Sequence, residues 1–256
     1  MTRIKDSRSS SHKELLYGVQ PVCAALRHRK RQFSELYIKS GKNNSGRISE
    51  IRKLAEVIGL PVNEVPGNRL KEMCPDAVHQ GVVLRCGNLP FSPISVLSLP
   101  VEVKLPLIVV LDQIEDPHNL GAVLRTCGFF DVSAVVVSKD HSCGLTPVVS
   151  KSSSGVAEWL PVISITNLTR FLQKQKSKGY WIVGLAEESN QSVSQLVRDK
   201  PFILVLGNEG RGIRPLIRKQ CDWLVSIAGN PEVCSLNVSN AVAIALNHFY
   251  VLPESI

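Results

Sequence analysis

Three short segments of the sequence combine residue types that could hold a ligand and act on a hydroxyl group. Residues 207–212 read GNEGRG and follow the apolar run 201–206, residues 235–239 read SLNVS, and residues 111–126 read LDQIEDPHNLGAVLRT. A buried strand that ends in glycines exposes backbone N–H and C=O groups, because residues without a Cβ let a ligand approach closely. The sequence therefore predicts a ligand site at the end of such a strand.

The order of the glycines argues against one common kind of site. A dinucleotide-binding loop reads G-x-G-x-x-G, follows the first strand of its fold and is trailed by an acidic residue on the next strand. Here the order is G-x-x-G-x-G, the loop lies in the last third of the chain, and Glu209 is inside it. Binding of a nicotinamide or flavin cofactor is therefore disfavoured.

Taken together and in this order, the three segments resemble the motifs of the SpoU/TrmH (SPOUT) family of RNA ribose 2′-O-methyltransferases. The likeness extends through residues 16–19 (LYGV), 79–82 (HQGV) and 145–148 (LTPV), and it covers about residues 14–250. The sequence is most similar to the branch that methylates a guanosine of large-subunit ribosomal RNA, which has bacterial and mitochondrial members. The resemblance implies S-adenosyl-L-methionine as the methyl donor, large-subunit rRNA as the partner, a homodimer, and neither a metal nor a membrane.

The resemblance also implies roles for particular side chains. The residues that match the family's catalytic positions are Asn119, Arg125, Glu209, Ser235 and Asn237. Transfer of a methyl group from a sulfonium needs no metal, but the site must orient the ribose and place charge near its oxygen. Because the pKa of arginine lies above roughly 12, we expect Arg125 to contact the target phosphate and the developing alkoxide. Asn119 and Arg125 are both expected to face the end of the sheet.

Simpler interpretations of these residues remain open. Arg125 could form a local ion pair on a helix surface, Glu209 could be an exposed loop acid, and Ser235 or Asn237 could cap a helix over residues 238–250.

The family's cofactor positions fall on an apolar slot, as an adenosine requires. They are Leu206, Gly207, Ile227 and Leu236. The family usually has Pro-Met-x-Gly after the isoleucine, whereas this chain has Ala-Gly-Asn-Pro at residues 228–231. That departure bears on the geometry of the cofactor loop.

Charge and proline content indicate how the chain is organised. Residues 1–88 contain 16 basic and 8 acidic residues, a net +8, whereas residues 89–256 contain 14 of each. A basic excess in one segment, including residues 27–31 (RHRKR), indicates a surface for polyanions, although it could also be a solvated charged face. We predict a disordered basic tail over 1–13, an RNA substrate-binding domain over 14–88, a proline-rich linker over 89–105 and a SPOUT methyltransferase domain over 106–256.

The fold class predicted from the pattern of elements is α/β. Apolar strands that alternate with helices in the second domain indicate a parallel sheet covered on both faces. The expected strands are 35–39, 62–65, 81–84, 107–111, 134–137, 181–185, 202–206 and 223–227, and the expected helices are 21–26, 48–58, 120–129, 168–178 and 238–250. The resemblance adds that the small domain is L30e-like and that the second is a trefoil-knotted α/β-knot fold, with the last helix threaded through a loop.

The cysteines and the amino-terminal residues bear on location. The seven cysteines show neither C-x-x-C nor zinc spacing, which favours buried reduced thiols. The Ser/Arg-rich start favours a mitochondrial matrix protein, with the cytoplasm as the alternative. For the homodimer, the apolar residues of the last helix are expected to supply the surface. They are Val242, Ile244, Ala245 and Phe249.

Two further hypotheses complete the prediction. His79 is expected to be a structural histidine, and Trp159, Trp181 and Trp223 are expected to pack in the core. The alternatives to an rRNA guanosine 2′-O-methyltransferase are a tRNA 2′-O-methyltransferase and a catalytically idle RNA-binding ribosome-assembly factor.

Overall fold

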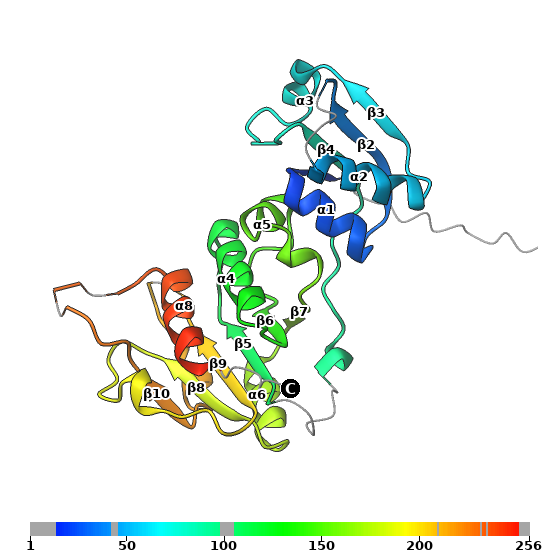
Figure 1. Cartoon of the computed structure of the whole chain (residues 1–256). Helices are drawn as coiled ribbons and strands as arrows, with labels where there is room; N and C mark the ends of the chain where they lie inside the picture. Colours follow the sequence, from blue (N-terminus) through cyan, green and yellow to red (C-terminus); the bar gives the residue numbers. More distant parts are fainter. Residues whose placement is uncertain are drawn as a thin grey trace, which may run out of the picture. The chain divides into compact units, whose positions relative to one another are not determined.

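A computed structural model of the chain describes residues 14–41, 46–97, 105–208, 210–230, 232–233 and 235–250. The predicted tail over 1–13 lies outside the described residues, as do 98–104 of the predicted linker and Glu209. The chain divides into two compact units, residues 1–90 and 91–256 (Figure 1). In the described part of the chain, no helix has the length and apolar character that crossing a membrane requires.

The first unit is a four-stranded mixed sheet with helices on both faces. Its elements are β1 (Glu14–Tyr17), α1 (Val19–His28), β2 (Phe33–Lys39), α2 (Gly46–Val57), β3 (Val62–Val65), α3 (Gly67–Met73) and β4 (Val82–Cys86). The strand order is β1-β4-β2-β3, and β4 runs antiparallel to both of its neighbours. Buried residues of α1 and α2 form a core on one face, while Leu70 of α3 packs with Val83 on the other.

Part of the basic run 27–31 is neutralised inside this unit. Arg27 pairs with Glu50. The Arg31 side chain is fully buried, and its Nη1 lies 3.1 Å from Glu14 Oε2. The surface that this run offers to a polyanion is therefore smaller than its sequence indicates.

The second unit is a six-stranded sheet in which every strand is parallel to its neighbours. The strands are β5 (Leu107–Leu111), β6 (Ala134–Ser138), β7 (Val162–Ile165), β8 (Trp181–Leu185), β9 (Phe202–Leu206) and β10 (Trp223–Val225), in the order β10-β8-β9-β5-β6-β7. Every residue of β5, β6 and β9 is buried, as expected for central parallel strands. The predicted parallel α/β fold is confirmed.

Helices cover both faces of this sheet (Figure 1). They are α4 (Pro117–Phe129), α5 (Pro147–Ser152), α6 (Leu168–Lys176), α7 (Pro215–Arg218) and α8 (Val238–Phe249). Apolar residues of α6 and α7 join one core with alternate residues of the strands. On the opposite face Phe249 of α8 meets Phe202 of β9, with ring centroids 4.6 Å apart. The threading of α8 through a knot stays a prediction.

The prediction that the last helix presents an apolar surface for a dimer is wrong. Val242, Ala245 and Phe249 are buried within the unit, so they offer no surface to a second copy. Only Ile244, which is 42% exposed, remains accessible among the four residues expected at the dimer surface.

The tryptophans also depart from the expected core packing. Trp159 is 37% exposed. Trp181 and Trp223 are half-buried and contact each other at the edge of the sheet, with ring centroids 4.3 Å apart. An apolar sequence context does not show that Trp223 lies on the edge strand β10 or that Trp159 follows a short 3₁₀ helix, positions at which a ring stays partly in solvent.

Other differences concern short elements. The strand β7 was not predicted, because its run is four residues long and contains Ser164. Residues 94–97, inside the predicted linker, form a short 3₁₀ helix whose Leu97 packs in the core of the second unit. His79 is held structurally as predicted, since its Nδ1 accepts a hydrogen bond of 3.0 Å from the Gly81 N–H.

Candidate active site

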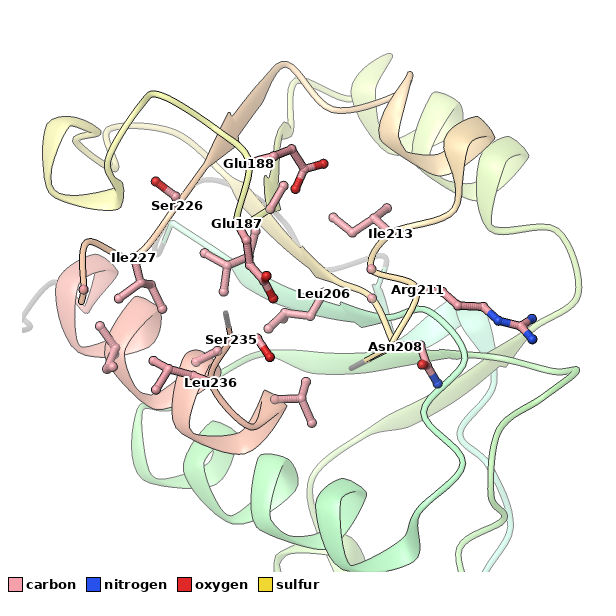
Figure 2. Close-up of a pocket in the computed structure, with 18 of the residues that line it drawn as sticks. Glu187, Glu188, Leu206, Asn208, Arg211, Ile213, Ser226, Ile227, Ser235 and Leu236 are labelled. Carbon is pink, nitrogen blue, oxygen red and sulfur yellow. The ribbon is translucent and has the colours of Figure 1, made fainter. Parts of the chain in front are cut away.

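A cleft of about 970 Å³ opens at the carboxyl ends of β8, β9 and β10 and beside the start of α8 (Figure 2). It occupies the position at which parallel α/β sheets bind their ligands. Five of the predicted site residues line it: Leu206, Gly207, Ile227, Ser235 and Leu236. Three of these side chains are aliphatic, and the loops between them supply backbone N–H and C=O groups. This combination fits an adenine ring.

The glycine loop closes tightly on itself at the end of β9. A Cβ on Gly207 would lie 2.0 Å from the Gly212 carbonyl carbon and 2.3 Å from the Ile213 nitrogen, distances that no side chain tolerates. Gly212 itself has a φ of +64°, in the left-handed region that favours glycine. The Gly212 N–H donates to the Asn208 carbonyl at 2.8 Å. The two glycines are therefore required by the shape of the loop.

A buried carboxylate fixes the position of this loop. The Asp112 side chain, directly after β5, is fully buried, and its Oδ1 lies 2.7 Å from Arg214 Nη2. Its oxygens also accept hydrogen bonds from Arg214 Nε at 2.9 Å and from the Arg214 backbone N–H at 3.2 Å. Charge-assisted bonds at a buried position are the strong ones. Asp112 therefore anchors Arg214, the second residue after the glycine loop.

Further hydrogen bonds extend this anchoring to a third strand. Asn208 Nδ2 donates to the Gln113 carbonyl at 3.0 Å. The Gln113 N–H in turn donates to Ser138 Oγ, at the end of β6, also at 3.0 Å. We refer to the residues Asp112, Gln113, Ser138, Asn208 and Arg214 as the loop network. It joins the segments that follow β5, β6 and β9.

Two predicted catalytic asparagines meet beside the cleft. Asn237 Nδ2 donates to Asn119 Oδ1 at 2.9 Å, although the residues are 118 positions apart in the sequence. Asn237 is also the N-cap of α8, since its Oδ1 accepts from the Ser239 N–H at 2.9 Å. Asn119 lies in the first turn of α4, whose N-cap is Asp116. Two helix N-termini, which carry partial positive charge, thus converge here.

Arg125 lies elsewhere. Together with Phe129, Trp159 and Ala243 it lines a second cavity of about 510 Å³ that does not include Asn119. The structure therefore does not bring Arg125 and Asn119 into one cavity, and the expectation that both face the end of the sheet stays a prediction. Six residues along a helix correspond to a rise of roughly 9 Å and a rotation of about 120° between the two side chains.

The remaining predicted positions complete the description of the site. Glu209 lies outside the described residues. Ala228, Gly229 and Asn230, where the sequence departs from the family's usual loop, line the cleft. Among the described residues, no group of three or more His, Cys, Asp or Glu side chains could hold a metal ion. Burial raises the pKa of Cys143 to about 11 and that of Cys221 to about 12, so both thiols stay protonated at neutral pH.

Replacing Asn237 by alanine should lower both the stability of α8 and the rate of the reaction. Loss of the cap removes about 1 kcal/mol of unfolding free energy, and the bond to Asn119 is lost with it. Asn237→Ser is the matched control, because serine also caps a helix but is too short to hold Asn119. Urea unfolding measures the stability and a turnover assay measures the rate. The serine variant, which keeps the cap but not the bond to Asn119, separates the two effects. Equal turnover for the alanine variant and the wild type would contradict a role of Asn237 in the reaction.

Sequence reasoning gave no role to Asp112, Arg214 or Ser138. A signal for Asp112 was present, because a carboxylate that directly follows five buried apolar residues must find a partner. The partner itself lies 102 positions away in the sequence, and no local pattern identifies it.

Two family models match the chain. Residues 106–247 match the SpoU rRNA Methylase family, and residues 15–92 match the model described as RNA 2′-O ribose methyltransferase substrate binding. A parallel α/β unit that matches the first model and has a cleft at its strand ends, preceded by a unit that matches the second, defines the class of protein as an RNA-modifying methyltransferase. The chain belongs to the SpoU rRNA Methylase family.

Known relatives agree with this assignment over most of the length. The chain is 39% identical to the 23S rRNA (guanosine-2′-O-)-methyltransferase RlmB of Pseudomonas putida, over 92% of this chain and 95% of the relative. It is 38% identical to the protein of that name from Ralstonia nicotianae, over 92% and 94%. The structure of the SpoU methyltransferase AviRb from Streptomyces viridochromogenes in complex with AdoMet superposes with a TM-score of 0.75 at 21% identity, over 96% of this chain and 92% of that one. The last likeness concerns the fold alone.

Proposed function

We propose that this protein transfers a methyl group from S-adenosyl-L-methionine to the ribose 2′-hydroxyl of a guanosine in large-subunit ribosomal RNA. The observation that carries the proposal is the cleft, which gathers Leu206, Gly207, Ile227 and Leu236 next to the Asn119–Asn237 pair. The names of the relatives, which specify 23S rRNA and guanosine, support the substrate.

The residues of the cleft fit the cofactor. The sulfonium of the bound cofactor supplies an activated methyl group, so the protein has to position the hydroxyl and stabilise its developing charge. The aliphatic side chains of Leu206, Ile227 and Leu236 would enclose the adenine, and the backbone of the glycine loop would offer it hydrogen bonds. The two helix N-termini at Asn119 and Asn237 lie beside the cleft, where their partial positive charge stabilises a developing alkoxide.

The test is a comparison of 2′-O-methylation in cells with and without the protein, together with transfer of labelled methyl groups to fractionated RNA. We expect one guanosine mark in large-subunit rRNA to be lost. A lost mark on tRNA, with rRNA unchanged, would overturn the substrate. Binding of the cofactor without transfer to any RNA fraction would favour the idle assembly factor, since the altered residues 228–230 lie in the cleft.

A tRNA substrate has less support. The structure of the Aquifex aeolicus TrmH/SpoU tRNA modifying enzyme matches only 57% of this chain, with a TM-score of 0.51. The rRNA methylating relatives match 91% to 92% of it, including the first unit. The relatives named here are bacterial, so they favour the cytoplasm over the mitochondrial matrix.

The first unit is proposed to recruit the RNA. Deletion of residues 1–90 removes the whole basic excess, so RNA affinity and its dependence on salt should both fall. The slope of log affinity against log salt concentration should fall by about one unit for each phosphate that the protein no longer neutralises. Cofactor affinity should be unchanged, because the described cleft residues lie in the second unit. Fluorescence anisotropy with an rRNA fragment at several salt concentrations gives the slope. An unchanged slope would assign RNA recruitment to the second unit.

We further propose that the protein forms a homodimer through the surface around the second cavity. Phe129, which is 80% exposed, and Trp159 contribute a large apolar area there, and Ala243 of α8 lies beside them. Exposed aromatic residues rimmed by charge are typical of protein interfaces. Arg125 belongs to this surface, so pairing would enclose it.

Light scattering of the wild type should give twice the 28.1 kDa mass of the chain. The double variant Phe129→Ser and Trp159→Ser should weaken the association by at least about tenfold. A wild-type protein that is monomeric at micromolar concentration would refute the homodimer.

A further inference from the structure

Two neighbouring glutamates follow β8, and their surroundings differ. Glu188 borders the cleft, but it forms an ion pair with Arg218. Glu187 lines the cleft, and its carboxylate makes no hydrogen bond or ion pair with any residue that the structure describes. Figure 2 shows the Glu187 carboxylate directed towards Leu206 and Ser235, whereas that of Glu188 points away from these two residues. Glu187 is exposed, and polar as well as aliphatic side chains line this cleft, so its unpaired carboxylate is available to a ligand.

The position of Glu187 in the sheet places it level with the glycine loop. Strands β8 and β9 are parallel neighbours, and Gly184 pairs with Val205. Glu187 is three residues beyond Gly184, just as Asn208 is three residues beyond Val205. Glu187 and the glycine loop therefore follow neighbouring strand ends at the carboxyl edge of the sheet, and both line the cleft.

A carboxylate at this position matches a known chemical requirement of nucleosides. The 2′ and 3′ hydroxyl groups of a ribose can both donate hydrogen bonds to one carboxylate, and such charge-assisted bonds are about twice as strong as neutral ones. In other parallel α/β folds, an acidic residue on the strand next to the glycine-ended strand accepts a bond from the ribose in this way. The geometry points to Glu187 as the residue that binds the ribose hydroxyls of the cofactor's adenosine. This inference rests on the proposed function.

The order of groups along the cleft agrees with this assignment. The adenine fits the aliphatic slot of Leu206, Ile227 and Leu236, and the reacting methyl group must approach Asn119 and Asn237. The ribose connects the two, and Glu187 lines the same cleft, with its carboxylate directed towards Leu206 and Ser235.

Calorimetric titration of the full chain tests the inference with three probes. The first two are S-adenosylhomocysteine and methylthioadenosine, which has the same nucleoside but no amino acid group. The third is 3′-deoxymethylthioadenosine. Glu187→Ala should weaken binding of the first two probes by at least about tenfold. Removal of the 3′ hydroxyl should weaken binding to the wild type by about fivefold or more, but binding to the variant by less than about twofold.

Glu188→Ala is the matched control, because it removes the same charge from the same loop, and its affinities should stay within about threefold of wild type. A loss in Glu187→Ala that is confined to S-adenosylhomocysteine would mean that the carboxylate binds the amino acid group, which overturns the inference. The inference is also overturned if removal of the 3′ hydroxyl lowers the affinity of the variant as much as that of the wild type. If the wild type binds none of the three probes, the proposed function fails, and the inference fails with it.

Discussion

Replacing Arg125 by alanine is expected to lower the rate of methyl transfer by at least about 100-fold while the affinity for S-adenosylmethionine stays near that of the wild type. The two effects separate because Arg125 is exposed and lines the second cavity, whereas the predicted cofactor residues line the cleft. A guanidinium that contacts the RNA phosphate and the reacting oxygen acts on the RNA and on the charge that develops in the transition state, not on the bound cofactor. Calorimetric titration with the cofactor beside a turnover assay measures both quantities.

The matched control is Arg170→Ala, which removes another exposed helix arginine from the same unit. Its turnover should equal that of the wild type. Turnover of Arg125→Ala within about threefold of wild type, less than 1 kcal/mol on the kinetic scale, would contradict a catalytic role.

Mixing the variants Arg125→Ala and Asn237→Ala adds a test of the proposed homodimer. If Arg125 of one copy serves the cleft of the other, mixed dimers have one intact site and regain activity. If each copy uses its own Arg125, the mixture stays inactive.

The second large effect is expected for Gly207→Ala, which should weaken cofactor binding by at least about 100-fold. The added Cβ would lie 2.0 Å from the Gly212 carbonyl carbon and 2.1 Å from its oxygen, and backbone atoms cannot yield as a flexible side chain does. The loop must therefore open, and the backbone groups that line the cleft move with it. Titration with S-adenosylhomocysteine gives the loss.

Gly210→Ala makes the same chemical change three residues away. The nearest atom to its added Cβ is Asn208 Oδ1 at 3.6 Å, an ordinary van der Waals contact. Affinity of this control should stay within a few-fold of wild type. If both alanine variants bind equally well, the close approach of Gly207 to Gly212 has no part in the shape of the site.

The sequence predicted the central strands because their composition leaves little choice. Residues 107–111 and 202–206 are continuous runs of aliphatic or aromatic residues that end at a charged residue or a glycine, and both strands have the predicted bounds. The strand β7 escaped prediction because one serine interrupts a four-residue run. The local sequence pattern is sufficient to predict a strand that is buried on both sides, but it does not identify a short one.

The site was predicted in part for a similar reason. The motif residues of the cleft follow strand ends, and parallel strand ends meet at one edge of the sheet, so Gly207, Ile227 and Leu236 come together. The position of Arg125 depends on helix geometry instead, because a rotation of about 120° separates its side chain from that of Asn119. The partners of Asp112 and Asn119 depend on contacts across more than 100 residues, which periodicity does not contain.

The loop network has a consequence for how the protein responds to its ligand. Since Asp112, Ser138 and Asn208 tie together the segments after three central strands, the glycine loop cannot open without disturbing the sheet itself. The site thus has its shape before a ligand arrives, and little ordering has to accompany binding. By linkage, a ligand at 100 times its dissociation constant adds about 2.7 kcal/mol to the free energy of unfolding. That increment protects the backbone amides of β5, β6 and β9 from hydrogen exchange, including those far from the ligand.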